Sequence, residues 1–472
     1  MSRGTGIVWG RYPASPVDSN AGFHTLAAIS AIIRHFRLGA WMHGFNAPAY
    51  LRKSGKGAQA CQWHFSLGHA LASPSALFPG IDEEEMFGMD MGSNLCLILD
   101  GGLGTTVEEL DSGATQHPVW SGKLLNDDPE LLVKTHLRFL EAGADVIETA
   151  TYQSCFTAFA RAGYTQEEAR SSMLSAVTIA ERAIAQFEQS SGRRRRPLIA
   201  LSFGPYGAQI AQEYRGIYPP PYGPSLGSTS SHETAFDTSK EELAAELALA
   251  DWHFEPLRIF ADSPHHWNMV SFVAFETIPL LREGRAIRRA MERLKELTAE
   301  RGLAWPKWWI SFVYPKGTFP EVKPGGEQIL PSEIARQMLE PSGEAGKYFS
   351  APDGLGINCT HMRFLHDIVL GYADGLQQVS DLTLPILVLY PDGGLEYDTK
   401  TKVWQAPHVH ADKAGGNQVE NKESWGRMLA EEGRQCVLMT RSGRLVWSGI
   451  IIGGCCKTTP EDIGTLKQDY CY

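Results

Sequence analysis

From Leu95 onwards, short apolar runs alternate with amphipathic stretches of helical period. A strand that is buried on both faces is nearly continuous in apolar residues, whereas a helix that covers a sheet repeats its apolar positions every three to four residues. Eight runs fit strands: Leu95–Asp100, Ala144–Ala150, Pro197–Phe203, Ser271–Thr277, Lys307–Tyr314, Gly354–Cys359, Leu384–Tyr390 and Val446–Gly454. This alternation is typical of a parallel α/β fold.

The segments between these runs carry helical patterns with recognisable ends. Pro129–Gly143, for example, begins with proline, which fits the first helical position, and ends on a glycine. Eight strands and about eight helices in about 375 residues fit one closed (β/α)8 barrel, the TIM barrel. An open doubly wound sheet is the alternative, but the glycine-rich turn at Asp100–Gly104 lacks the GxGxxG spacing of a dinucleotide-binding sheet.

Residues 1–90 follow a different pattern. Before Asp82 this segment has seven basic residues, a single acid (Asp18) and one apolar patch, Leu26–Phe36. Low acid content with scattered arginine is shared with mitochondrial transit peptides, but we prefer a disordered extension or a misassigned start of the coding region. We therefore predict an N-terminal extension over residues 1–90 and a barrel over residues 91–472.

Composition excludes several classes of function. The formal net charge of −11 argues against nucleic-acid binding, and no apolar run reaches the length of about 18 residues that predicts a transmembrane helix. Eight cysteines in 472 residues do not make a disulfide scaffold and favour a reducing compartment. We expect a cytoplasmic protein, with mitochondrial import as the alternative, that is a monomer or small homo-oligomer and binds neither nucleic acid nor membranes.

Polar and reactive residues fall at the carboxyl ends of the predicted strands. In chain order these residues are Asp100, Glu148 and Thr149, Glu276 and Thr277, Asn358 and Cys359, and Cys455 and Cys456. In a closed barrel the carboxyl ends form one ring, at the face where active sites lie. Two long loops, residues 205–239 and 392–420, also follow strands, so we expect them at the same face.

Cys455 and Cys456 stand side by side after Gly453 and Gly454. Adjacent residues of a regular strand point to opposite faces, so both sulfurs can face one centre only where the chain has left the strand, and glycines permit such a turn. Cys359 is the natural third thiolate, since three cysteines can hold a tetrahedral Zn²⁺ with an open fourth position. The alternative is three buried free cysteines that pack as small apolar residues.

The charge of such a site narrows its chemistry. Zinc bound by three thiolates carries a net negative charge, which makes it a poor Lewis acid, but a coordinated thiol still loses its proton. The pattern therefore favours attack by a substrate thiolate over hydrolysis by metal-bound water. Asp100 and Glu276 are positioned to hold the ammonium group of an amino-acid substrate; alternatively, they cap helices or pair with neighbouring bases.

Longer sequence blocks surround these residues. They are LDGGLGTTVEEL (Leu99–Leu110), WSGKLL (Trp120–Leu125), ADVIETATYQ (Ala144–Gln153), SFGPYGAQIAQEYRGIY (Ser202–Tyr218), FETIP (Phe275–Pro279), GINCTH (Gly356–His361), YPDGGLEYD (Tyr390–Asp398) and GGCCKTTPEDI (Gly453–Ile463). In this order and spacing, from about Leu97 to about Leu466, the chain resembles the homocysteine S-methyltransferase family.

The resemblance implies a zinc-dependent enzyme built on a (β/α)8 barrel. Zinc would be held by the cysteine of the GxNC block and both cysteines of GGCC, which are Cys359, Cys455 and Cys456 here, and L-homocysteine would supply the fourth sulfur. Substrate-binding residues would be Asp100 and Gly101 of the D-G-G turn, Glu276 and Thr277 of the F-E-T block, and Asn358.

The implied reaction transfers a methyl group from a sulfonium donor, S-methylmethionine or S-adenosylmethionine, to homocysteine and yields methionine. A cationic sulfonium favours aromatic faces, and Trp120, Tyr152, Tyr206 and Tyr214 are candidates for that contact. The alternatives are betaine as the donor, a seleno-acceptor, or a non-catalytic barrel that binds a metal or a thiol.

Overall fold

The computed structural model describes residues 95–110, 120–193, 195–225, 232–344, 347–380, 382–394, 396–398, 403–405 and 422–471. The predicted N-terminal extension over residues 1–90 lies outside these ranges, as do parts of both predicted long loops.

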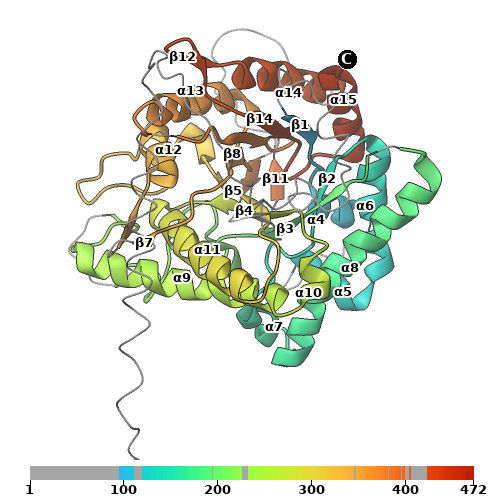
Figure 1. Cartoon of the computed structure of the whole chain (residues 1–472), viewed down its shortest axis with the longest axis horizontal. Coiled ribbons are helices and arrows are strands. Elements are labelled where there is room, and N and C mark those ends of the chain that lie inside the picture. Colours follow the sequence, from blue (N-terminus) through green and yellow to red (C-terminus); the bar gives the residue numbers. More distant parts are fainter. Residues whose placement is uncertain are drawn as a thin grey trace, which may run out of the picture. The chain divides into compact units, whose positions relative to one another are not determined.

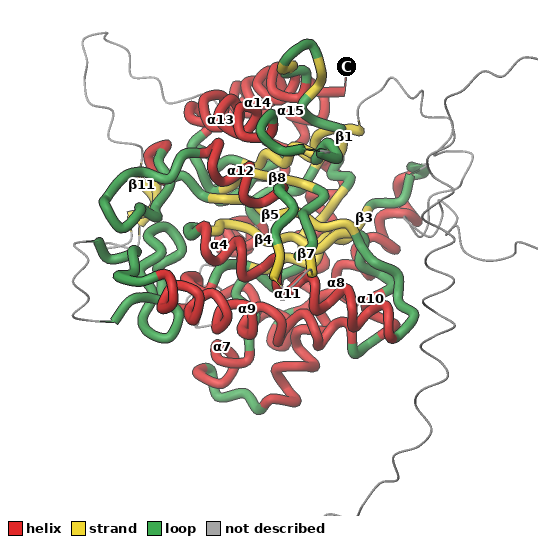
Figure 2. Tube along the Cα trace, turned by 60° about the vertical axis from the view of Figure 1, so that its left-hand side comes forward, coloured by secondary structure: helices red, strands yellow, loops and turns green. Residues whose placement is uncertain are grey.

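Eight parallel strands form one sheet in the described part of the chain (Figures 1 and 2). They are β1 (Leu95–Ile98), β2 (Val146–Glu148), β3 (Leu198–Phe203), β4 (Phe272–Ile278), β5 (Lys307–Phe312), β8 (Gly354–Asn358), β9 (Ile386–Tyr390) and β14 (Gly449–Ile452). Their order is β1-β14-β9-β8-β5-β4-β3-β2, and a parallel bridge between Leu99 and Val146 brings β1 beside β2. The predicted barrel is confirmed, and each predicted strand is present.

Helices surround the strands (Figure 1). Those in the described residues are α4 (Leu103–Leu110), α5 (Leu124–Asp127), α6 (Pro129–Ala142), α7 (Phe156–Arg161), α8 (Gln166–Ser191), α9 (Ser239–Ala261), α10 (Pro264–Trp267), α11 (Leu281–Glu300), α12 (Pro331–Leu339), α13 (Leu365–Leu376), α14 (Lys422–Val437) and α15 (Pro460–Cys471). Among them, no helix is long and apolar enough to cross a membrane.

The ends of α6 show how local sequence sets these boundaries. The Asp128 side chain accepts a hydrogen bond from the Leu131 amide at 3.0 Å, and Pro129 occupies the first helical position. Gly143 then ends the helix with a φ of 114°, a left-handed conformation that glycine adopts without strain. The helix that was predicted over Pro129–Gly143 is therefore present.

The core has two layers because alternate strand residues point to opposite faces of the sheet. Leu97 and Leu99 belong to the cluster inside the barrel, together with Trp309 and Ile451. Ile98, between the two leucines, belongs instead to the larger cluster between strands and helices. This packing anchors both faces of each strand, so the strand ends are held in one ring.

The described residues also contain three small antiparallel pairs of strands that were not predicted. They are β6 (Gly343–Glu344) with β7 (Lys347–Tyr348), β10 (Glu396–Asp398) with β11 (Val403–Gln405), and β12 (Thr440–Arg441) with β13 (Arg444–Leu445). Strands of two or three residues are too short to show a period in the sequence. The β10–β11 pair lies inside the segment 392–420 that we predicted to be a long loop.

Candidate active site

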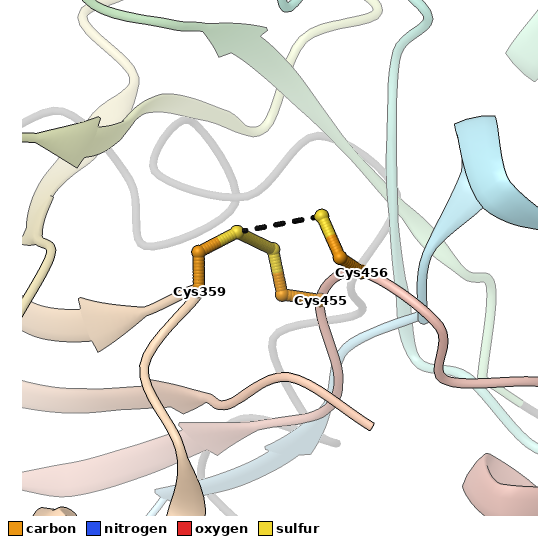
Figure 3. A group of neighbouring side chains, drawn as sticks. All are labelled: Cys359, Cys455 and Cys456. Atoms are coloured by element: carbon orange, nitrogen blue, oxygen red, sulfur yellow. Dashed lines mark hydrogen bonds between the residues drawn. A yellow bond between two sulfur atoms is a disulfide. The ribbon is translucent and has the colours of Figure 1, made fainter. Parts of the chain in front are cut away.

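Three cysteine sulfurs meet at the carboxyl end of the barrel (Figure 3). Cys359 directly follows β8, and Cys455 and Cys456 follow β14. The three sulfur atoms lie within 4.8 Å of one another, and those of Cys359 and Cys456 are 3.7 Å apart. The structure thus brings together the three residues that the sequence analysis grouped, although they come from two regions almost a hundred positions apart.

Cys359 and Cys455 are joined by a disulfide in this structure (Figure 3). The sequence predicts three zinc-binding thiolates here, or three free buried cysteines, and no disulfide. Because their Cα atoms are 5.6 Å apart, the two residues are within the usual reach of a disulfide. The same closeness that suits a shared metal ion therefore also permits oxidation of the pair.

The structure corrects the reason for Gly453 and Gly454. Neither glycine has a positive φ; the left-handed residue of this segment is Lys457, with a φ of 64°. A Cβ atom at Gly453 would lie 2.6 Å from the Leu99 carbonyl oxygen, and one at Gly454 would collide with the Thr458 side chain. Gly453 is therefore needed for close packing against the end of β1, and Gly454 for close packing against Thr458. The turn itself spans Cys455 to Thr458, where the Thr458 amide donates to the Cys455 carbonyl at 3.1 Å.

Thr458 ties the two-cysteine segment to the glycine-rich turn after β1. Its hydroxyl donates to the Cys455 carbonyl at 2.6 Å and accepts from the Gly102 amide at 3.0 Å. A Cβ atom at Gly101 would lie 2.8 Å from this hydroxyl oxygen, so a side chain at Gly101 would push the two segments apart. Gly101 thus borders the site by allowing this approach.

Helix α15 begins just after this segment. Pro460 is its first residue, and the Thr459 hydroxyl and amide both interact with the Asp462 carboxylate, at 2.8 and 2.9 Å. This reciprocal pairing across three residues satisfies amide donors at the helix start. It holds the end of the two-cysteine segment in place.

Asn358 links the carboxyl ends of β8 and β4. Its side-chain oxygen accepts from the Thr277 amide at 2.7 Å, and its amide group donates to the Thr277 hydroxyl at 2.8 Å and to the Cys455 sulfur at 3.7 Å. Thr277 and Cys359 have φ values of 61° and 43°, which are unfavourable for residues with a Cβ atom. Such strain is common at functional sites and persists only where neighbours hold it. That Thr277 and Asn358 contact substrate directly stays a prediction.

Three carboxylates, one just after β1, one at the end of β2 and one near the end of β4, approach one another beside the thiols. Asp100 is fully buried and accepts from the Glu148 amide at 3.0 Å, while Glu276 accepts a hydrogen bond from the Ser202 hydroxyl. One oxygen of Asp100 and one of Glu148 are enclosed without a hydrogen-bond partner. From the sequence, Glu148 is predicted at a strand end, but no role is predicted for it.

Burial and mutual repulsion shift the acidity of this trio. Burial raises the pKa of Glu276 from 4.5 to about 7. Burial also raises the pKa of Asp100 and of Glu148 well above the usual range, and the Glu276 carboxylate adds to both shifts. Acidic groups that repel one another in this way are stabilised by a cation bound between them.

Two of the four predicted aromatic residues lie near the cysteines. The Tyr214 hydroxyl hydrogen-bonds the Cys456 sulfur. Burial raises the pKa of both Tyr152 and Tyr214 well above the usual range, and Cys456 adds to both shifts. Burial raises the pKa of the Cys456 thiol to about 12, and the Asp392 carboxylate contributes. Tyr206 instead packs in a separate aromatic group with Tyr218, Tyr222 and Trp252. The Trp120 side chain is outside the described part of the chain.

Glu283, which the sequence analysis missed, anchors the loop that carries Tyr214. This buried carboxylate accepts from the Tyr206 amide at 2.7 Å and from the Tyr218 hydroxyl at 2.6 Å, and its other neighbour is the His253 ring at 3.0 Å. An acid in the first turn of a helix is too common a signal to have identified this contact from sequence.

The fold and these side chains define an enzyme barrel with a thiol centre beside buried carboxylates. The model of the homocysteine S-methyltransferase family matches residues 97–470, and the chain belongs to that family. Membership of an enzyme family sets aside the alternative of a non-catalytic barrel.

Individual relatives agree with this assignment. The chain is 28% identical over 372 residues to homocysteine S-methyltransferase YbgG of Bacillus subtilis, and the match covers 78% of this chain and 92% of the relative. It is 30% identical over 386 residues to homocysteine S-methyltransferase 4 of Zea mays, with 79% and 89% covered. The fold is similar to that of the metallated form of homocysteine methyltransferase MmuM of Escherichia coli, with a TM-score of 0.50 and 22% identity. The match covers 80% of this chain and 96% of that chain.

Proposed function

We propose that this enzyme transfers a methyl group from a sulfonium donor, S-methylmethionine or S-adenosylmethionine, to the thiol of L-homocysteine and forms methionine. The observation that carries the proposal is that three cysteines and three carboxylates converge at one end of the barrel. Thiols and acids at the same end of the barrel match the sulfur and the ammonium group of a thiol amino acid.

The three cysteines fit a zinc ion. Sulfur atoms around a tetrahedral zinc ion stand about 3.8 Å apart, because each Zn–S bond is about 2.3 Å long. The sulfur atoms of Cys359 and Cys456 are 3.7 Å apart, and two-electron reduction of the Cys359–Cys455 disulfide frees both of its cysteines as thiols beside Cys456. Bound zinc would favour the thiolate form of a coordinated substrate thiol.

Asp100, Glu148 and Glu276 bind the substrate ammonium group in this proposal. The unpartnered oxygens of Asp100 and Glu148 accept its hydrogen bonds, and the positive charge relieves the repulsion among the three carboxylates. Binding at this point orients the homocysteine sulfur toward the cysteines. Such positioning supplies a large part of the acceleration of a two-substrate reaction.

Tyr152 and Tyr214 face the methyl donor. Their hydroxyl groups interact with Cys456, and a cationic sulfonium beside these two residues would be attracted to their aromatic faces. In the reaction, the homocysteine sulfur forms a bond to the methyl carbon while the bond from that carbon to the donor sulfur breaks. The electron pair of the broken bond stays on the donor, which leaves as a neutral thioether.

A seleno-acceptor is the second candidate for the acceptor role. The chain is 28% identical over 385 residues to the selenocysteine Se-methyltransferase of Brassica oleracea, and 79% of this chain is covered. Selenium at the position of the homocysteine sulfur would use the same thiol centre and the same carboxylates. Relative rates with the two acceptors separate these functions.

We also propose that residues 91–472 are the catalytic unit, that residues 1–90 are a separate extension, and that the enzyme acts in the cytoplasm as a monomer or small homo-oligomer. The family match over residues 97–470 supports the first boundary. Removal of residues 1–90 should leave methionine formation unchanged.

The test combines a donor comparison with a metal assay on one reduced preparation. Methionine formation is measured from homocysteine with S-methylmethionine, S-adenosylmethionine and betaine, before chelation, after chelation and after zinc is restored. We expect activity with a sulfonium donor, loss on chelation and recovery with zinc. Cys359→Ser should abolish activity, whereas Cys155→Ser, at a buried cysteine that contacts Thr157, should not. Full activity without zinc, or in Cys359→Ser, would refute the zinc site.

A further inference from the structure

A second group of metal-binding side chains lies between α13 and α14, outside the active site. The Nδ1 atom of His366, a carboxylate oxygen of Glu432 and the Cys436 sulfur lie within 4.8 Å of one another. Glu432 Oε1 is 3.0 Å from His366 Nδ1 and 3.0 Å from Cys436 Sγ. We call His366, Glu432 and Cys436 the α13–α14 cluster.

Helix geometry preorganises two of the three groups. Glu432 and Cys436 are four residues apart on α14, so their side chains lie one turn above the other on the same face. His366 approaches from the first turn of α13, a different helix. With two ligands on one helix and the third on the neighbouring helix, all three can bind one ion after only small side-chain movements.

The observed separations are close to those around a tetrahedral zinc ion. Nitrogen, oxygen and sulfur ligands at about 2.0 to 2.3 Å from zinc stand about 3.3 to 3.6 Å apart. The two 3.0 Å contacts of Glu432 would widen by a few tenths of an ångström, and the distance from His366 to Cys436 would close from within 4.8 Å.

Charge and burial also suit a divalent cation. A thiolate, a carboxylate and a neutral imidazole balance the charge of Zn²⁺, which leaves a neutral complex. Cys436 is fully buried and the Glu432 side chain is 20% exposed, so neither charge is well solvated on its own. The His366 side chain is 44% exposed, which provides a route for an ion from solvent.

We propose that the α13–α14 cluster is a second metal site, which binds Zn²⁺ through His366, Glu432 and Cys436 with solvent as the fourth ligand. Binding releases the Cys436 thiol proton to solvent. The site joins the helix that follows Cys359 to the helix that precedes β14 and its cysteines. Its role is to fix the two segments that carry the active-site thiols.

The test uses the full chain with Cys359→Ser, Cys455→Ser and Cys456→Ser, so that metal binding at the active site cannot contribute. Co²⁺ is titrated into the reduced triple variant, and the near-ultraviolet absorption of a cobalt–thiolate bond is recorded. We expect about one equivalent to bind with this absorption. Zn²⁺ should displace the cobalt and raise the unfolding midpoint as its free concentration increases.

Further substitutions in the same background assign the ligands. Cys436→Ser should remove the absorption. His366→Ala should weaken cobalt binding at least about 10- to 100-fold, which is the effect of losing a residue that only hydrogen-bonds to a metal ligand. Glu432→Gln keeps the shape of the side chain and should weaken binding similarly. Cys155→Ser is the matched control, since this buried cysteine lies outside the cluster.

Cobalt binding without thiolate absorption, or absorption that persists in Cys436→Ser, would overturn the proposal and leave the cluster a hydrogen-bonded network. Because the background lacks the three active-site thiols, the result does not depend on the proposed methyl transfer. Activity of the unmodified enzyme tests that function separately.

Discussion

Replacement of Glu276 by glutamine should stabilise the folded enzyme at neutral and alkaline pH while it weakens substrate binding. The Glu276 carboxyl is 6% exposed, and burial raises its pKa from 4.5 to about 7. Its folded-state pKa is therefore above its unfolded-state value, and the folded protein favours the protonated form. Glutamine imitates that form and can still accept the hydrogen bond from Ser202.

The size of the effect follows from the pKa shift. Each pKa unit corresponds to about 1.36 kcal/mol, so ionisation of Glu276 costs the folded state about 3 kcal/mol. The protonated carboxyl gives its full stability below a pH of about 4.5, and this contribution is lost as the pH rises through about 7. The free energy of unfolding of Glu276→Gln should therefore be higher than that of the parent by about 3 kcal/mol at about pH 8. At about pH 5 the difference should be less than about 1 kcal/mol.

Urea titrations at the two pH values measure this difference in the free energy of unfolding. Both proteins are reduced and free of metal, so that neither a disulfide nor zinc contributes. In activity assays, loss of one charged partner of the ammonium group should lower kcat/KM about 10- to 100-fold, mainly through KM. Without this partner, the activity of the variant should also depend less on pH near 7.

Glu283→Gln is the matched control. Glu283 is also buried, but it accepts hydrogen bonds from the Tyr206 amide and the Tyr218 hydroxyl, so the same substitution should destabilise the protein. If Glu276→Gln were less stable than the parent at about pH 8, the carboxylate would be stabilising in the empty site. Repulsion among the three carboxylates would then not favour a bound cation.

Three other substitutions probe different features. Asn358→Ala should cost about 1 to 3 kcal/mol in urea titrations, because it leaves the buried Thr277 amide without its acceptor; unchanged stability would contradict this. Tyr214→Phe removes the hydrogen bond to Cys456 and should lower kcat/KM about fivefold, while the circular dichroism spectrum stays unchanged. Full activity of this variant would exclude a role for the hydroxyl. Burial lowers the pKa of His136 from 6.5 to about 4. The neutral imidazole therefore contributes its full stability above about pH 6.5, and this contribution is lost as the pH falls through about 4. His136→Leu should therefore reduce acid denaturation, and an unchanged acid profile would refute this.

The barrel could be predicted because each of its strands is buried on both faces. Val446–Gly454 and Ser271–Thr277 are nearly continuous in apolar residues, and such runs stand out from the amphipathic helices between them. Parallel connection then places every carboxyl end on one face. That single rule is enough to group Cys359 with Cys455 and Cys456 from the sequence.

The contacts within the site could not be predicted in the same way. The bonds between Asn358 and Thr277 join residues 81 positions apart, and they depend on the register of β4 and β8 and on a left-handed φ at Thr277. Likewise, the need for Gly453 arises from the carbonyl of Leu99, on a strand far away in sequence. Periodicity predicts the face on which a side chain lies, but not the atom that it meets.

The same features indicate that substrate and stability are coupled at this site. Left-handed Thr277 and Cys359, and carboxylates with enclosed but unpartnered oxygens, each cost the empty protein free energy. A bound ammonium group offsets the carboxylate repulsion, and that gain grows as the pH rises and the acids ionise. Homocysteine should therefore raise the unfolding midpoint more at about pH 8 than at about pH 5. In the proposed binding mode, relief of this carboxylate repulsion contributes to the binding of an amino-acid cation.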